Sequence, residues 1–384
     1  MFDRILSVNL DAQHPLSTGL TADSRLIQAY QGVRPAVTPV WFMRQAGRSL
    51  PEYRELRVGT RMLDVCLDPE LASEITLQPV RRHNTDAGIF FSDIVVPLKL
   101  VGVDVEIVPG RGPVLGKAVR TAADVAELIA LDPAQLDAAL TPITQAVGRA
   151  VAELGSTPLV GFAGAPFTLA AYLVEGGPSK DHIHARTLMH ADPDAWAALM
   201  AWTADVTGRF LRAQVLAGAS AAQLFDSWAG SLSLADYSRF VAPASTAALA
   251  HVRDLGYPAP ASAAAAGVDD ARRSVPIVHF GVGTGELLQA MHDVGADAVG
   301  VDYRVPLDEA NRRLGGAVPL QGNVDPALLS APWPVLEAHV RDVLKRGRSA
   351  PAHVLNLGHG VPPETDPDVL TRIVELVHTH NAGE

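Results

Sequence analysis

The sequence alternates short apolar runs with longer Ala- and Leu-rich segments of helical period, and eight such runs occur along the chain. The runs are rich in Val, Ile and Phe and are bounded by Gly, Pro or polar residues, as strands commonly are. Because they are nearly continuous instead of alternating with polar residues, they indicate parallel strands buried on both faces, with helices as crossovers. They span residues 38–44, 86–92, 157–164, 220–227, 275–283, 296–303, 318–323 and 353–360.

Eight strand-helix units predict an α/β fold, a single (β/α)8 TIM barrel that uses residues 1–384 as one domain. A doubly wound open sheet is the structural alternative, because a strand count taken from one sequence carries errors. Three of the helical segments open on Asp followed by Pro, the order expected for an N-cap and a first turn. These segments span residues 68–84, 192–218 and 366–381.

Three segments are expected to be additions to the barrel. Residues 1–19 form an N-terminal extension. Residues 100–120 carry turn signals at Pro109-Gly110 and at Gly112-Pro113, and they predict a β-hairpin after the second strand. Residues 257–274 are rich in Ala, Pro and Ser, which predicts a surface loop insertion.

The composition excludes several classes of function. A net charge of −11 and a pI near 5.6 argue against a nucleic-acid-binding surface. No stretch has the length and apolar character of a membrane helix or of a cleaved signal sequence. Cys66 is the only cysteine, so an intrachain disulfide and a Cys-rich metal site are both excluded. We therefore expect a cytoplasmic protein without a metal, which binds neither nucleic acid nor a membrane.

Against this acidic background, residues 41–57 (WFMRQAGRSLPEYRELR) gather four arginines. Arg44 and Arg48 follow the first predicted strand and are separated by small residues, so the backbone there can approach a ligand closely. The second half of the segment mixes Glu with Arg, which is typical of a solvated helix face. We expect Arg54 at the surface and Arg57 behind the site, which leaves Arg44 and Arg48 to bind an anion.

Other polar residues follow different strands at the same end. Asp93 comes after the second strand, Tyr172 lies two turns into the helix after the third, Ser227 closes the fourth, and His359 closes the eighth between two glycines. Taken singly, each has a structural explanation, such as a helix cap for Asp93 or a core position for Tyr172. In a barrel these strand ends share the face that carries active sites, so their agreement predicts one site at that mouth.

Five segments in this order closely resemble the uroporphyrinogen decarboxylase family, from about residue 20 to 380: PVWFMRQAGRSLPEYRELR, GIFFSDIVVP, GFAGAPFTLAAYLVEGG, QLFDSWAG and NLGHG. The resemblance implies a cytoplasmic homodimer without metal or organic cofactor. The implied reaction in heme biosynthesis removes the four acetate carboxyls of uroporphyrinogen III and gives coproporphyrinogen III and four CO2. Carried over by motif, the catalytic residues would be Asp93 and Arg44. The substrate-binding residues would be Arg44, Gln45, Ala46, Gly47, Arg48, Asp93, Tyr172, Ser227 and His359.

Two positions depart from the family pattern. Phe167 stands where some relatives carry Trp, and Trp228 follows Ser227 where some carry His. Both changes are expected to alter the pocket walls more than the chemistry. Phe162 and Phe225 are further candidates for apolar walls.

The residue types fit the implied chemistry. Loss of CO2 leaves a carbanion that needs an electron sink, and a pyrrole ring protonated at its α-carbon can serve in place of a cofactor. Asp93 would stabilise that cation, and the arginines would pair with substrate carboxylates. The proton donor stays open between Arg44, water and a substrate carboxyl.

Two other functions compete with this interpretation. A zinc methyltransferase of the same superfamily needs His and Cys ligands, often as His-x-Cys after the fifth strand, whereas this chain has His279-Phe280-Gly281 there. A non-catalytic tetrapyrrole-binding protein would share the arginines and the pocket but would release no CO2.

Overall fold

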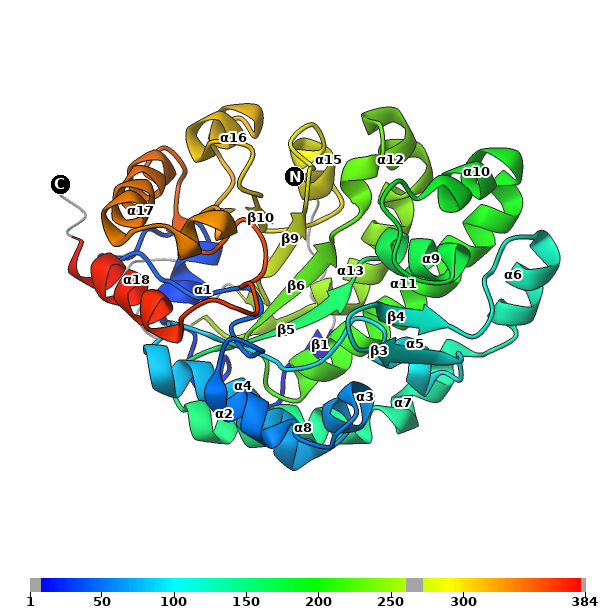
Figure 1. The fold of residues 1–384 in the computed structure, drawn as a ribbon, viewed down its shortest axis with the longest axis horizontal. Helices are drawn as coiled ribbons and strands as arrows, with labels where there is room; N and C mark the ends of the chain where they lie inside the picture. Colours follow the sequence, from blue (N-terminus) through cyan, green and yellow to red (C-terminus); the bar gives the residue numbers. More distant parts are fainter. Residues whose placement is uncertain (1–7, 260–271, 381–384) are drawn as a thin grey trace.

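The computed structural model describes residues 8–259 and 272–380. Its central sheet is parallel, with the strand order β12-β11-β10-β9-β6-β5-β2. All residues of these strands are buried except Phe225, which is partly buried. The sheet curls, and helices surround it (Figure 1). Its strands are β2 (Gly88–Ile89), β5 (Leu159–Gly164), β6 (Ala221–Asp226), β9 (Ile277–Gly281), β10 (Ala298–Gly300), β11 (Leu320–Gln321) and β12 (His353–Val354).

The first predicted strand, residues 38–44, runs between the two edges of this sheet. Val40 forms a parallel bridge with Leu355, just after β12. On the other side, the Asp86 backbone N–H donates to the Val40 carbonyl at 2.9 Å, just before β2. The segment thus contacts both edges, but through one bridged residue and not through a strand. An α/β fold with a curled parallel sheet is confirmed.

Helices fill the crossovers between the strands. Three of them begin after the predicted Asp-Pro pairs, and Asp68, Asp192 and Asp366 each accept a backbone N–H of the first helical turn. The described helices are α1 (Arg25–Tyr30), α2 (Pro51–Leu56), α3 (Met62–Cys66), α4 (Pro69–His83), α5 (Val96–Leu100), α6 (Ala122–Ile129), α7 (Leu136–Ala139), α8 (Thr141–Leu154), α9 (Pro166–Glu175), α10 (Ile183–Ala191), α11 (Pro193–Leu216), α12 (Leu234–Phe240), α13 (Ala242–Arg253), α15 (Leu288–Asp293), α16 (Leu307–Arg313), α17 (Trp333–Gly347) and α18 (Pro367–Thr379). Short 3-10 turns are η1 (Pro133–Gln135), η2 (Ala229–Ser231) and η3 (Pro326–Ser330).

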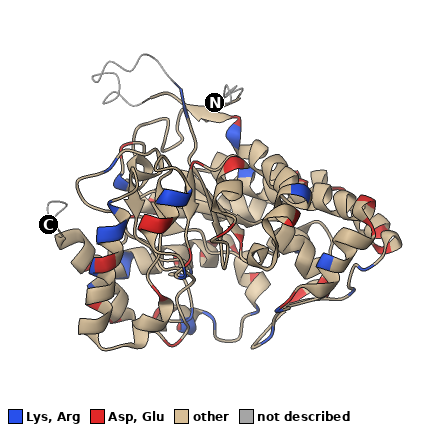
Figure 2. Cartoon of the chain, turned by 90° about the horizontal axis from the view of Figure 1, so that it is seen from above, with Lys and Arg blue, Asp and Glu red and all other residues tan. Residues whose placement is uncertain are grey.

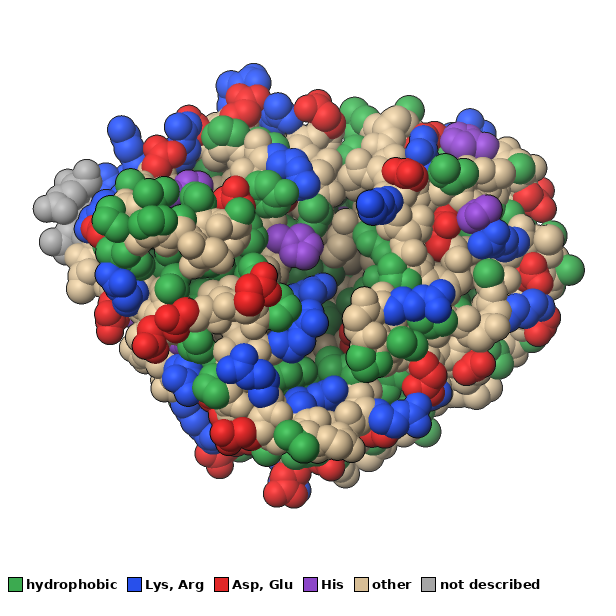
Figure 3. All heavy atoms as spheres, in the orientation of Figure 1, with side chains coloured by type: hydrophobic (Ala, Val, Ile, Leu, Met, Phe, Trp, Pro, Cys, Tyr) green, Lys and Arg blue, Asp and Glu red, His purple; other side chains and the backbone are tan. Residues whose placement is uncertain are grey.

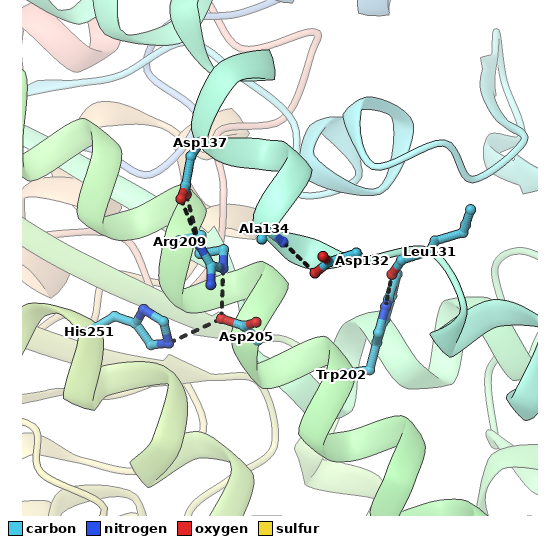
Figure 4. Close-up of polar contacts among 8 residues, drawn as sticks. All are labelled: Leu131, Asp132, Ala134, Asp137, Trp202, Asp205, Arg209 and His251. Atoms are coloured by element: carbon cyan, nitrogen blue, oxygen red, sulfur yellow. Dashed lines mark hydrogen bonds and ion pairs between the residues drawn. The ribbon is translucent and has the colours of Figure 1, made fainter.

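Helix α11 is tied to its neighbours by polar contacts as well as by apolar packing. Arg209 binds Asp205 on its own helix at 2.9 Å and Asp137 of α7 at 2.8 Å, and Asp205 lies 3.4 Å from His251 of α13 (Figure 4). Trp202 donates its Nε1–H at 2.7 Å to a backbone carbonyl in the α6–η1 connection. These contacts fix α11 to α7, to α13 and to the α6–η1 connection.

A short antiparallel pair follows α5. Strand β3 (Val105–Val108) pairs with β4 (Gly112–Leu115), and residues 109–111 connect them. Pro109-Gly110 is therefore at the turn, whereas Gly112-Pro113 lies inside β4, so the second turn signal was wrong. The pair docks on α9, where the Gly176 carbonyl that follows the helix accepts the Leu115 N–H at 3.2 Å.

A second small sheet joins parts of two predicted additions. Strand β1 (Val8–Asn9) runs parallel to β7 (Leu255–Tyr257), which runs antiparallel to β8 (Arg273–Ser274). Residues 1–7 and 260–271 lie outside the described residues, so the N-terminal extension over 1–19 and the loop insertion over 257–274 stay predictions. Both ends of the second segment, however, belong to this sheet.

Charged residues of both signs are interspersed over the outer helices (Figure 2). In the described ranges, no helix has the length together with the apolar character that crossing a membrane requires.

Candidate active site

A cleft of about 510 Å³ opens at the carboxyl ends of the parallel strands. Its walls come from segments that follow β9, β10, β11 and β12 and from the segment after Val40. Basic side chains and a histidine border a hollow near the centre of this face (Figure 3). The lining residues are Arg44, Arg48, Val282, Tyr303, Arg304, Asp325, Pro326, Ala327, His359, Gly360, Val361, Pro362 and Pro363.

Arg44 enters the cleft from a strained turn. Its φ of 62° lies in the left-handed region, which residues with a side chain rarely adopt. The turn is held before Arg44, where the Met43 N–H donates to Asn356 Oδ1 and the Met43 carbonyl accepts the Val361 N–H, both at 2.9 Å. The Arg44 side chain crosses Gly360 so closely that a Cβ there would overlap its Cδ. Close approach therefore requires glycine at position 360.

Gln45 faces the opposite way and is fully buried. Its Oε1 accepts the Phe42 N–H at 3.0 Å, and its Nε2 donates to the Ala87 carbonyl at 2.9 Å. The Oε1 bond thus closes the turn on itself, and the Nε2 bond fastens the turn to the residue before β2. Ala46 and Gly47 are partly buried between the two arginines. We assign the Gln45 side chain to holding this loop, and its predicted contact with a substrate stays a prediction.

Asp93 lies between β2 and α5. Its Oδ1 accepts the Val95 N–H at 3.0 Å, so the carboxylate also closes the turn into α5. Burial raises the pKa of Asp93, while the Val95 hydrogen bond and the positive charge of Arg44 oppose that rise. No described residue forms an ion pair with Asp93. Arg44 is therefore the cation that helps to keep this carboxylate ionised.

Tyr172 and Trp228 form a stacked pair of aromatic rings. Their rings stack with centroids 3.9 Å apart and planes at 27°, and His182 packs on Trp228 at 4.4 Å. Burial and the charge of Asp93 raise the pKa of Tyr172 to about 12, so the phenol stays protonated and can donate a hydrogen bond at neutral pH. Ser227, directly before Trp228, is partly exposed.

The rings of Phe162 and Phe225 meet edge to face at 5.5 Å, but neither residue lines the cleft, so their role as apolar walls stays a prediction. Phe167 is fully buried and contacts Trp196 at 6.1 Å. Of the two departures from the family pattern, Trp228 stacks on Tyr172 and is not among the residues that line the cleft, and Phe167 packs in the core.

His359 follows β12 and lines the cleft. Its Nδ1 accepts the Gly360 N–H at 2.7 Å, which leaves the proton of the neutral ring on Nε2. Burial lowers the pKa of His359, and the charges of Arg44 and Arg304 lower it further, while Asp302 opposes them. The ring is therefore neutral at neutral pH and can donate one hydrogen bond through Nε2.

Two arginines have a larger part in this region than the sequence indicated. Arg304 follows β10 and lines the cleft, although only the arginines of residues 41–57 were singled out. The sequence feature that could have identified Arg304 is its position just after a predicted strand, which resembles the position of Arg44 at the end of the first one. Arg57 has buried Nε and Nη1 atoms without a hydrogen-bond partner among the described residues. The charge of Asp93 raises the pKa of the Cys66 thiol, and the charge of Arg57 lowers it.

The position examined for a His-x-Cys zinc motif has other contacts. His279 is fully buried, its Nδ1 lies 3.0 Å from the Met291 carbonyl, and its Nε2 lies 3.7 Å from Asp226 Oδ2. Within residues 8–259 and 272–380, no group of three or more His, Cys, Asp or Glu residues could hold a metal ion.

Comparisons with known proteins agree with the sequence resemblance. Residues 21–380 match the family model for uroporphyrinogen decarboxylase (URO-D). A uroporphyrinogen decarboxylase of Leifsonia xyli subsp. xyli is 73% identical over 370 residues, which cover 96% of this chain and 98% of the relative. One of Arthrobacter sp. (strain FB24) is 69% identical, with 94% and 98% covered, and one of Salinispora tropica is 56% identical, with 94% and 91% covered.

Among solved structures, a methyltransferase from Methanosarcina mazei superposes with a TM-score of 0.70 over 93% of this chain and 98% of its own. The identity is 18%, so this likeness concerns the fold alone.

Proposed function

The chain belongs to the uroporphyrinogen decarboxylase family, and from this membership we infer that it decarboxylates uroporphyrinogen in porphyrin and heme biosynthesis. In finer detail, we propose that it removes all four acetate carboxyls of uroporphyrinogen III, giving coproporphyrinogen III and four CO2 without a cofactor. One observation carries the proposal beyond the family. Arg44 lines a basic cleft at the strand ends and at the same time acts electrostatically on the partly buried Asp93.

The arginines of the first turn are available to an anion. Neither Arg44 nor Arg48 forms an ion pair with a described residue, whereas arginines such as Arg209 and Arg313 are bound to carboxylates. A guanidinium pairs with a carboxylate through two parallel hydrogen bonds and stays charged at every relevant pH. We propose that Arg44 and Arg48 bind carboxylates of the eight on uroporphyrinogen, with the backbone of Ala46 and Gly47 close to the substrate.

Asp93 supplies the electrostatic part of the mechanism. Protonation of the pyrrole α-carbon makes the ring a cation, which then accepts the electrons released with CO2. The Asp93 carboxylate accepts hydrogen bonds from pyrrole N–H groups and stabilises this cation, as a preorganised charge does best in a buried site. A guanidinium with a pKa above ~12 is a poor acid. The proton therefore comes from a water or a substrate carboxyl that Arg44 holds.

The remaining predicted residues bind the substrate periphery. Tyr172 and His359 each have one hydrogen-bond donor, which suits an acetate or propionate oxygen, and Ser227 can donate over a shorter reach. The neutral state of His359 and the protonated state of Tyr172 support these roles.

The finer architecture is part of the same proposal. We propose that residues 38–44 close the curled sheet into an eight-stranded barrel that forms one domain over residues 1–384, with β3 and β4 as an added hairpin. The parallel bridge between Val40 and Leu355, and the hydrogen bond from the Asp86 N–H to the Val40 carbonyl, support closure. We also propose a cytoplasmic homodimer, for which the family is the support. Light scattering on the purified protein should give twice the chain mass of 40.5 kDa, and a monomer would contradict the dimer.

Activity is tested by incubating the purified protein with uroporphyrinogen III in the dark under reducing conditions. Chromatography should show coproporphyrinogen, preceded by intermediates with seven, six and five carboxyls. A chelator in the buffer should leave the rate unchanged. A rate that falls when the chelator is added would contradict the proposal that the reaction needs no metal. Binding of the tetrapyrrole without release of CO2 would instead identify a non-catalytic binding protein.

A further inference from the structure

Arg304 lies where a third substrate carboxylate can be bound. It follows β10 and shares the cleft with Arg44, Arg48 and His359. Its guanidinium stacks over the ring of the neighbouring Tyr303 at 4.5 Å from the ring centroid. Its side chain is 49% exposed, so solvent and ligands reach it.

A buried carboxylate fixes the direction of this guanidinium. Asp302 is only 2% exposed, and its Oδ2 accepts both the Gly283 N–H at 2.6 Å and the Arg304 Nη1–H. Its Oδ1 accepts the Arg304 backbone N–H at 3.1 Å, and its carbonyl accepts Asn323 Nδ2 at 2.8 Å. Asp302 is thus immobilised by a backbone N–H of one other segment and by a side-chain amide of another. The loops after β9, β10 and β11 meet at this residue.

Only one nitrogen of the guanidinium is used by this anchor. Among the described residues, none accepts a hydrogen bond from Nε or Nη2 of Arg304, so a face with free donors remains. A fixed guanidinium loses less entropy when it binds a carboxylate, which favours affinity. Asp325, the one carboxylate among the residues that line the cleft, has Oδ1 engaged with the Ala327 N–H at 2.9 Å and forms no ion pair with Arg304.

The charges in the cleft separate Arg304 from the proposed reaction centre. Arg44 and Arg304 both act on His359, whereas of these two arginines it is Arg44 that acts on Asp93. Arg304 therefore lies toward the His359 end of the cleft, away from the carboxylate that would stabilise the reacting ring.

We propose that Arg304 is a specificity-determining residue that binds, at the His359 end of the cleft, a propionate carboxylate of the tetrapyrrole. This inference rests on the proposed function. A propionate is retained in substrate and product alike, so the interaction is equally strong in the ground state and in the transition state. Such uniform binding lowers KM and leaves kcat unchanged.

The test compares Arg304→Gln and Arg304→Lys with the wild-type enzyme in steady-state decarboxylation of uroporphyrinogen III. Arg304→Gln should raise KM roughly tenfold, as expected for loss of about 1.4 kcal/mol of binding, with kcat within about twofold. Arg304→Lys keeps the positive charge but loses the planar guanidinium that binds a carboxylate through two hydrogen bonds. Its KM should therefore lie between those of the wild type and Arg304→Gln. Because the product keeps its propionates, competitive inhibition by coproporphyrinogen III should weaken by a similar factor in Arg304→Gln.

Arg341→Gln is the matched control, because Arg341 is an exposed arginine bound to Glu337 on α17, outside the cleft. It should leave both constants unchanged. An unchanged KM in Arg304→Gln, a fall in kcat at constant KM, or undiminished product inhibition would each overturn the proposal. The Lys variant keeps a cation beside Asp302 and decides the question if the Gln variant does not fold. A wild-type enzyme without decarboxylase activity would instead overturn the proposed function itself.

Discussion

Replacement of Asp93 by Asn removes one charge and very little else. The two side chains have the same shape, and the Asn oxygen can still accept the Val95 N–H that closes the turn into α5. The amide also keeps a hydrogen-bond acceptor for a pyrrole N–H. What it cannot supply is the negative charge that, in our mechanism, stabilises the cationic ring in the transition state.

The expected loss follows from Coulomb's law. Two unit charges about 4 Å apart interact by about 4 kcal/mol at an effective dielectric constant near 20. That energy corresponds to roughly a thousandfold in rate, and the retained acceptor offsets part of it. We therefore expect kcat for uroporphyrinogen III to fall by roughly 10²–10³ in Asp93→Asn. Asp93→Glu keeps the charge at a shifted position and should lose less.

In Asp93→Asn, the free energy of unfolding should be unchanged or higher, whereas kcat should fall. Burial raises the pKa of Asp93, so the folded protein binds this proton more tightly than the unfolded chain does. Above the folded-state pKa the ionised carboxylate therefore costs stability, and the cost disappears as the pH falls through that pKa toward the ordinary value of 3.8. Asn carries no such cost. Urea unfolding at neutral pH should show Asp93→Asn at least as stable as the wild type, with a smaller difference in acid.

These two measurements together decide the role of Asp93. Near wild-type kcat in a folded Asp93→Asn protein would refute the charge mechanism. A marked loss of stability in that variant would show that the side chain acts mainly as a turn cap, and the fall in kcat could then not be assigned to lost charge.

Three further substitutions test the loop that carries Arg44. Gly360→Ala places a Cβ where the Arg44 side chain lies, so kcat/KM should fall at least tenfold while circular dichroism stays unchanged; wild-type kinetics would contradict the close approach. Gln45→Ala breaks two buried hydrogen bonds to the backbone and should lower the free energy of unfolding by about 1–3 kcal/mol, and an unchanged urea midpoint would count against the structural role. Arg48→Ala should raise KM for the eight-carboxylate substrate roughly tenfold, as loss of one charged hydrogen bond implies, and an unchanged KM would remove Arg48 from the site.

The strand order was largely predictable from the sequence because seven of the eight apolar runs contain a strand of the central sheet. The first run differs for a physical reason. The Val40 N–H donates to the Asp86 side chain at 2.8 Å, and the Met43 N–H donates to the Asn356 side chain, where a regular strand would bind backbone carbonyls. Side-chain acceptors of this kind lie far away in the sequence, so the local pattern of hydrophobic residues does not indicate them.

The candidate site was predictable where one rule was enough. The carboxyl ends of parallel strands share a face, and this rule brought Arg44 and His359 to one cleft. Arg304, which follows β10, was not predicted as a site residue because the sequence around it, VDYRVP, looks like an ordinary turn. Its direction depends on Asp302, which is itself held by a backbone N–H after β9. Contacts between loops of different strands cannot be read from either loop alone.

The loop around Arg44 makes sense only if its charge is needed near Asp93. A left-handed backbone at a residue with a side chain costs free energy, and so does an ionised carboxylate in a buried position. Neither cost contributes to the fold, yet the turn at Arg44 is held in place by Asn356 and left open by Gly360. The positive charge of Arg44 opposes the protonation of Asp93, so each unfavourable feature is partly offset by the other. In the proposed mechanism, the sequence at these positions is explained by the need to keep a carboxylate ionised beneath the substrate, and not by the packing of the sheet and its helices.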